Sequence, residues 1–140
     1  MTIPDILFHG TTARRWQGIQ EDRLLRVAPL GVNAVSMSDD PRVALYFARM
    51  AVYVELSERL GLNAEPIILA VDAKALLSEG YKLERFSDPI WGQGNCDWER
   101  EVVCWTDVPL RFVKETNLAF TLPNRAIDRR GARNQKRRTA

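Results

Sequence analysis

Apolar and polar residues follow two different periods along this chain, and the two periods predict both strands and helices. Strands are expected where apolar residues form short continuous or alternating runs. The runs of this kind are 6–8, 32–38, 66–71, 81–83, 98–105, 110–113 and 118–122. The first run leads into a polar turn at 9–12. One apolar stretch, 24–27, is too short to distinguish a strand from a helix end.

Three segments carry apolar residues at helical spacing instead: 13–21, 41–60 and 72–79. Asp40 followed by Pro41 is a strong helix start, because the carboxylate caps free N–H groups and proline is favoured in the first turn. The inward face of helix 41–60 is predicted from residues three or four apart: Val43, Phe47, Met50, Ala51 and Val54. Glu55 and Arg59 lie four apart and are expected to pair on this helix.

Many strands with one long helix and a short N-terminal helix predict an α+β fold. A length of 140 residues is typical of a single domain, which we assign to 1–122. The chain is 46% hydrophobic and 27% charged, as in ordinary globular proteins. It shows no secretory leader and no apolar run near the ~20 residues of a membrane span, so no membrane partner is expected.

Two cysteines without a leader favour a reducing, cytoplasmic setting. These cysteines and the single histidine have no ligand spacing typical of a structural zinc site, so no metal is expected.

The C-terminal segment 123–140 is strongly basic and lacks apolar periodicity, so we interpret it as a flexible tail. From residue 125 onward it holds seven basic residues and one acidic residue, a net charge of +6, whereas the rest of the chain carries −4. Such a tail attracts phosphate backbones, which makes nucleic acid an expected partner. A solubilising role, or packing against the acidic body, remains open. The basic residues are Arg125, Arg129, Arg130, Arg133, Lys136, Arg137 and Arg138.

Two acids occur on the predicted strand 98–105, and the period of two places Glu99 and Glu101 on one face together with Val103 and Trp105. A carboxylate at the mouth of a buried strand can stabilise positive charge or accept a proton. The alternative is a charged strand end that points at water.

His9 and Gly10 follow the first apolar run, where glycine permits close approach of a ligand to the backbone. A lone histidine is more often satisfied by a backbone carbonyl, and that alternative stays open. Tyr46, near the start of the long helix, offers a floor for a planar ligand or is simply a core aromatic.

Three segments in this order resemble the signatures of ADP-ribosyltransferase-fold proteins: 7–11 (LFHGT), 35–40 with 44–48 (VSMSDD and ALYFA), and 99–103 (EREVV). The likeness is nearest the branch with a His-Tyr-Glu triad, which includes poly(ADP-ribose) polymerases and RNA 2′-phosphotransferases. It covers residues 6–113 and implies a split β-sheet core and the use of NAD as substrate.

The resemblance assigns roles on the NAD molecule. His9 would hydrogen-bond a ribose hydroxyl, the backbone of Gly10 would hold the nicotinamide carboxamide, and Thr11 would lie beside it. Tyr46 would stack on the nicotinamide ring. Glu101 would hydrogen-bond the ribose 2′-hydroxyl as positive charge grows on that sugar.

Further positions complete the comparison with the family. Glu99 matches an acid that some members use to orient the acceptor. A family tyrosine falls on Ser36, and a family serine that binds the carboxamide falls on Val43. Ser38 is a candidate to replace one of these cofactor contacts.

The resemblance therefore implies an NAD-dependent ADP-ribosyltransferase or NAD glycohydrolase, with nucleic acid as a plausible acceptor. Two alternatives accompany it. An RNA 2′-phosphotransferase-like enzyme would grip an RNA phosphate with arginines, for which the candidates are Arg14, Arg15, Arg26 and Arg42. A non-catalytic module on the same fold would only bind a nucleotide or a nucleic acid.

Overall fold

The computed structural model describes residues 2–28, 33–59, 64–86 and 100–122. Its main element is a six-stranded sheet in the order β5-β6-β3-β1-β4-β8, and every pairing in it is antiparallel. The strands are β1 (Ile6–Thr12), β3 (Val35–Ser38), β4 (Pro66–Asp72), β5 (Leu83–Arg85), β6 (Glu101–Cys104) and β8 (Val113–Thr116). A short ribbon pairs β2 (Leu24–Leu25) with β7 (Val108–Pro109).

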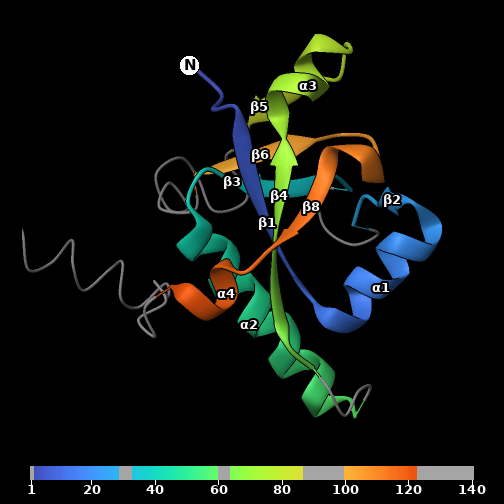
Figure 1. Ribbon diagram of the computed structural model, residues 1–140, viewed down its shortest axis with the longest axis vertical. Helices are drawn as coiled ribbons and strands as arrows, with labels where there is room; N and C mark the ends of the chain where they lie inside the picture. The colour runs from blue at the N-terminus through green and yellow to red at the C-terminus, as the bar shows by residue number, and fades with distance from the viewer. Residues whose placement is uncertain (1, 29–32, 60–63, 87–99, 123–140) are drawn as a thin grey trace, which may run out of the picture.

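Four α-helices and one 3-10 turn accompany the sheet in the described segments (Figure 1). They are α1 (Ala13–Asp22), α2 (Pro41–Ser57), α3 (Ala73–Ser78), α4 (Leu118–Thr121) and the 3-10 turn η2 (Leu110–Phe112). The predicted α+β class is therefore confirmed. Within these segments, none of the helices combines the length and apolar character needed to cross a bilayer.

The sheet separates two apolar layers. Leu7, Val71, Met37 and Val102 alternate with residues of the other face and join the larger core, which also contains Trp16 of α1. On the opposite face, Phe8 of β1 and Ile68 of β4 lie under Ala44 and Leu45 of α2, with residues of α4 packed beside them. Both layers remove apolar surface from water, which is the main driving force for this arrangement.

Helix α2 approaches β1 very closely at Gly10. A Cβ atom built on Gly10 would lie 1.9 Å from the carbonyl oxygen of Ala44 and 2.9 Å from the backbone nitrogen of Ala48. Only a glycine on the strand opposite small residues on the helix permits this contact. The buried side of α2 accordingly contains Ala44, Leu45 and Ala48.

The predicted inward face of α2 was largely wrong. Val43 is buried, but Phe47, Met50 and Val54 are 36%, 48% and 41% exposed. The helix is apolar on two sides, so periodicity alone offered two solutions, and the close approach to Gly10 selected the side with the small residues. The helix also ends at Ser57, ahead of Arg59, whose φ of 56° is left-handed.

Local capping signals were more reliable. Thr12 accepts a hydrogen bond from the N–H of Arg15 at 3.2 Å and caps the start of α1. Asp40 accepts one from the N–H of Arg42 at 2.9 Å, with Pro41 in the first turn. Asp72 caps α3 through the N–H of Ala75 at 3.0 Å.

Three other predictions were wrong, and contacts with distant segments explain the first and the last of them. Residues 9–12 form strand rather than turn, since β1 pairs with β4 along all seven residues. Residues 110–112 form the turn η2 before β8 begins at Val113. Residues 118–121 form helix α4, which packs on Ile68 and Leu45, instead of a last strand.

Glu55 is buried, with only 1% of its surface exposed, and does not form the expected surface pair with Arg59. Its Oε1 atom accepts hydrogen bonds from the hydroxyl of Thr12 at 2.8 Å and from Nε of Arg14 at 2.9 Å. Its Oε2 atom is buried without a partner among the described residues. A buried carboxylate is stable only when paired, so this residue ties α2 to the start of α1.

We expect Gly10→Ala to destabilise the fold by about 3 kcal/mol or more, because the new methyl group would overlap backbone atoms of α2. Urea unfolding would measure the change. Gly18→Ala is the matched control: a Cβ at this position of α1 meets nothing within 4 Å, so it should be neutral or stabilise by up to about 1 kcal/mol. Equal stability of the two variants would contradict this packing.

Glu55→Gln should lower the unfolding free energy by about 1–3 kcal/mol, because Arg14 loses its ionic partner and an amide replaces the buried acceptor. Glu58→Gln, at an exposed position at the end of the same helix, should change it by less than about 0.5 kcal/mol. Chemical unfolding of both variants at neutral pH tests the difference. A loss that is no larger at residue 55 than at residue 58 would disprove the link.

Candidate functional site

Three strands from distant parts of the sequence meet at the centre of the sheet. β3 pairs with β1 at one position, Phe8 with Ser38, and with β6 along four, including Ser36 with Val103 and Ser38 with Glu101. In Figure 1, β3 and β6 run across the view, whereas β1 and β4 run down it. The junction between β1 and β3 is therefore the place where two differently oriented parts of the sheet meet.

His9 spans this junction. Its Nδ1 atom lies 2.7 Å from the backbone carbonyl oxygen of Ser36. A carbonyl oxygen can only accept, so Nδ1 carries the proton and donates it. In the neutral ring, Nε2 is consequently the acceptor nitrogen. The backbone carbonyl of Ser36 thus satisfies Nδ1, as the structural alternative for a lone histidine expects. Nε2 can still accept a hydrogen bond from a ligand.

Ser36 continues the connection to the acid. Its hydroxyl donates a hydrogen bond to Oε2 of Glu101. The register explains the contact: Glu101 stands opposite Ser38, and Ser36, two residues away, shares its face. A continuous path therefore links His9, Ser36 and Glu101, which are 27 and 65 residues apart in sequence.

Burial lowers the pKa of His9 below its ordinary value of 6.5, because the charged ring loses hydration. The hydrogen bond to the Ser36 carbonyl favours the charged ring and opposes this shift, whereas the positive charge of Arg15 adds to it. The ring is therefore neutral at pH 7. Its Nε2 lone pair is then available to accept a hydrogen bond from a hydroxyl group.

A cluster of charges supports the strand that carries the acid. Arg85 of β5 donates to Asp39 through both terminal nitrogens, with an Nη2–Oδ2 distance of 2.9 Å. Arg100, immediately before Glu101, donates to the same carboxylate at 2.8 Å. These contacts join the end of β3 to β5 and to the start of β6, so they set the position of Glu101 relative to Ser36.

Burial opposes ionisation of Asp39, but the hydrogen bonds and charges of Arg85 and Arg100 outweigh it and lower the pKa of this carboxyl. The pKa of Asp40 is lowered in the same way, with Arg42 outweighing burial. A carboxyl group with a depressed pKa stabilises the folded state at pH values above its ordinary pKa. That contribution is lost as the pH falls through the lowered pKa.

The other residues predicted to contact NAD differ in their burial and in their neighbours. Gly10 faces α2 as described, and the side chain of Thr11 is buried at 2% exposure. Ser38 is buried, and its hydroxyl accepts the N–H of Asp40 at 3.1 Å, so it serves the turn into α2. Val43, where the resemblance implies a serine, is part of the apolar interior.

Tyr46 is partly buried on α2, and its ring meets Phe47 edge-on with centroids 5.2 Å apart. Two residues along a helix rotate the side chain by about 200°. Tyr46 therefore points away from the side of α2 where Ala44 meets Gly10. Its stacking on a nicotinamide ring stays a prediction.

Other predicted residues are placed by their partners or lie outside the described ranges. Arg14, Arg26 and Arg42 pair with Glu55, Asp22 and Asp40. Arg15 instead acts on His9 through its charge. Glu99 and the basic tail residues lie outside the described residues. Within the part of the chain that is described, no group of three or more His, Cys, Asp or Glu side chains is arranged to hold a metal ion.

Comparison with known proteins does not assign this chain to a family. No protein-family model matches the chain, and no curated protein matches it.

Sequence reasoning missed how Ser36 is used, because it treated this residue as the loss of a family tyrosine. It also missed the support of Glu101 by Asp39 and Arg85. The alternation of β3 and β6 offered a signal for Ser36, but only a known register would have paired it with Glu101.

We predict that His9 titrates with a midpoint below 6.5, since burial and Arg15 disfavour the charged ring. It is the only histidine, so the imidazole proton resonances in an NMR titration report this residue alone. Between the folded and unfolded midpoints the unfolded chain binds more protons, so stability should fall as pH drops below 6.5.

Arg15→Gln should raise that midpoint, whereas Arg26→Gln, which removes an arginine paired with Asp22, should leave it unchanged. A midpoint at or above 6.5 would show that the ring is not in the described environment.

Proposed function

We propose that this chain is an NAD-dependent ADP-ribosyltransferase or NAD glycohydrolase that acts at the junction of β1, β3 and β6. The observation that carries the proposal is the hydrogen-bonded path His9–Ser36–Glu101. It brings an imidazole and a carboxylate from the two ends of the domain to one place in the sheet. These are two of the three groups that the resemblance requires.

The proposed reaction breaks the bond between C1′ of the ribose and the nicotinamide nitrogen. The bonding electrons leave with nicotinamide, and positive charge develops on the sugar. Glu101 would stabilise that charge, and a carboxylate held by Ser36 needs little reorganisation to do so. Water or an acceptor oxygen then bonds to C1′ and loses its proton.

His9 would orient the substrate. Its neutral ring presents Nε2 as an acceptor, which suits a ribose hydroxyl donor. The arrangement of β3 and β6 across β1 and β4 agrees with the split sheet that the resemblance implies (Figure 1). The roles of Gly10, Thr11, Ser38 and Tyr46 towards the nicotinamide rest on the resemblance alone, because Gly10 packs against α2 and Tyr46 points away from that contact.

The acceptor is proposed to be a nucleic acid, because the segment from residue 125 carries a net charge of +6. An RNA 2′-phosphotransferase-like activity is the second candidate. Arg15 favours it, since this cation acts on His9 while Arg14, Arg26 and Arg42 are engaged in ion pairs. A phosphate bound near His9 would require such a charge.

Release of nicotinamide from NAD by the full chain, with and without RNA or DNA, tests the proposal. Glu101→Gln keeps the size of the side chain but removes its charge, and it should lower the rate by about 10²–10³-fold. Ser36→Ala should lower it by about tenfold, because Glu101 loses the hydrogen bond from the Ser36 hydroxyl. Glu115→Gln removes an exposed carboxylate on β8 and is the matched control, with an unchanged rate.

If the wild type releases no nicotinamide, and Glu101→Gln binds NAD as the wild type does, both enzyme proposals fail and a binding module remains. Transfer of a 2′-phosphate from RNA to NAD would select the phosphotransferase. Deleting residues 125–140 should weaken nucleic-acid binding and flatten its salt dependence if the tail contacts the acceptor.

A further inference from the structure

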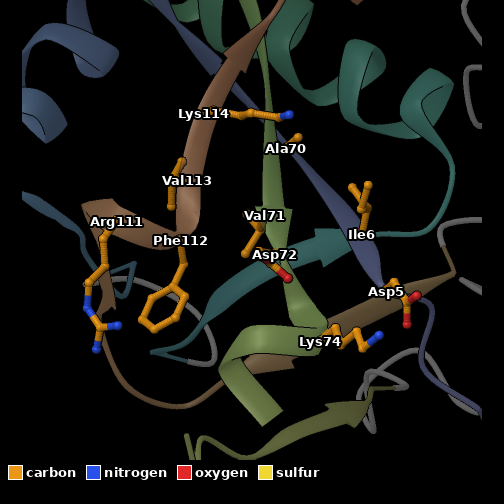
Figure 2. A pocket seen from close by; sticks show the side chains of 10 residues that line it. All are labelled: Asp5, Ile6, Ala70, Val71, Asp72, Lys74, Arg111, Phe112, Val113 and Lys114. Carbon is orange, nitrogen blue, oxygen red and sulfur yellow. The ribbon is translucent and has the colours of Figure 1, made fainter. Parts of the chain in front are cut away.

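A hollow of about 290 Å³ lies at the other end of β1, and its lining shares no residue with the His9–Ser36–Glu101 path (Figure 2). Ile6 lies opposite Asp72, and Ala70 lies opposite Lys114, so these four residues share one face of the sheet. Helices α2 and α4 cover this face around Gly10 and Ile68. Towards the start of β1 the face is open, and Ile6 is 49% exposed.

The floor of the hollow is apolar, whereas its rim is charged. Ala70 of β4 is buried beneath it, whereas the side chains of Val71 and Val113, which also line it, face the larger core. Arg111 belongs to the rim, but Glu79 holds it through two contacts of 2.8 Å, and it stacks over the Phe112 ring at 4.2 Å. Its charge is therefore already compensated.

The two lysines of the rim differ from Arg111 because no ion pair compensates their charge among the described residues. Among the described residues, neither Lys74 nor Lys114 has an ion-pair partner within 4.0 Å. Figure 2 places Lys114 at one end of the hollow beside Ala70, and Lys74 at the other end beside Asp5, with Asp72 near the middle. The hollow therefore has one end where Lys114 lies apart from the carboxylates of the lining and one end where Lys74 lies beside a carboxylate acceptor.

We propose that this hollow binds a nucleoside monophosphate. The phosphate, which carries a charge of about −2 at pH 7, would lie against Lys114. The ribose hydroxyls would donate to Asp72 and Asp5, and the flat apolar body would rest between Ile6 and the floor. The volume is at the lower limit of small-molecule sites, which suits one nucleotide rather than a dinucleotide such as NAD.

Titration of the full chain with AMP, followed by amide NMR shifts, tests the assignment. Shifts should concentrate on β4, β8 and the start of α3. Adenosine, which lacks the phosphate, and ribose 5-phosphate, which lacks the base, should each bind at least tenfold more weakly. Lowering the pH below about 6 should weaken AMP binding, because the phosphate loses a charge.

Lys114→Gln should weaken AMP binding at least tenfold without changing the affinity for adenosine. Lys82→Gln, an exposed lysine outside the hollow, is the matched control and should change neither affinity. Glu101→Gln should also leave AMP binding intact, which separates this site from the proposed reaction centre.

Three results would overturn the assignment. They are no binding at 5 mM AMP, equal affinity in Lys114→Gln and the wild type, and shifts that concentrate around His9 and Glu101 instead of β4 and β8. None of these results bears on nicotinamide release.

Discussion

The close approach of α2 to β1 at Gly10 is the contact on which the rest of the arrangement depends. Because a glycine on the strand meets Ala44 and Ala48 on the helix, the two backbones come within a distance that no side chain would permit. That contact decides which side of α2 is buried. It thereby leaves Phe47 and Met50 towards solvent and carries Glu55 into the interior, where it meets Thr12 and Arg14.

The packing of β1 against α2 and β4 also determines the position of the candidate site. β1 is held between β4 and α2, so His9 has a defined position from which it reaches the carbonyl of Ser36. β6 is held from the other side, where Asp39 binds Arg85 and Arg100. His9, Ser36 and Glu101 each take part in a hydrogen bond across strands, and these hydrogen bonds restrain the groups proposed for chemistry.

The hollow exists because α2 covers only part of one face of the sheet. The start of β1 and the adjoining part of β4 therefore stay open. At the covered end the face of Phe8 and Gly10 packs against α2. At the open end the same strands present Ile6 and Ala70 beside lysines that have no ion-pair partner among the described residues, an environment suited to a ligand that has both an apolar body and a charge.

The sequence by itself determined the features that depend on neighbouring residues. The cap at Asp40, the buried strand that begins at Pro66 and the mixture of strands with one long helix were all predictable from local preferences. Glu101 was predicted on a strand and lies on one, whereas His9 was predicted in a turn and lies on β1; the activity of both is a proposal.

Only the tertiary structure decided the buried side of α2, the partners of Glu55, the helix at 118–121 and the joining of His9 to Glu101 through Ser36. Each of these depends on which distant segments pair and in what register. Local periodicity carries no information on that choice when a helix is apolar on two sides or when a serine can face either of two strands.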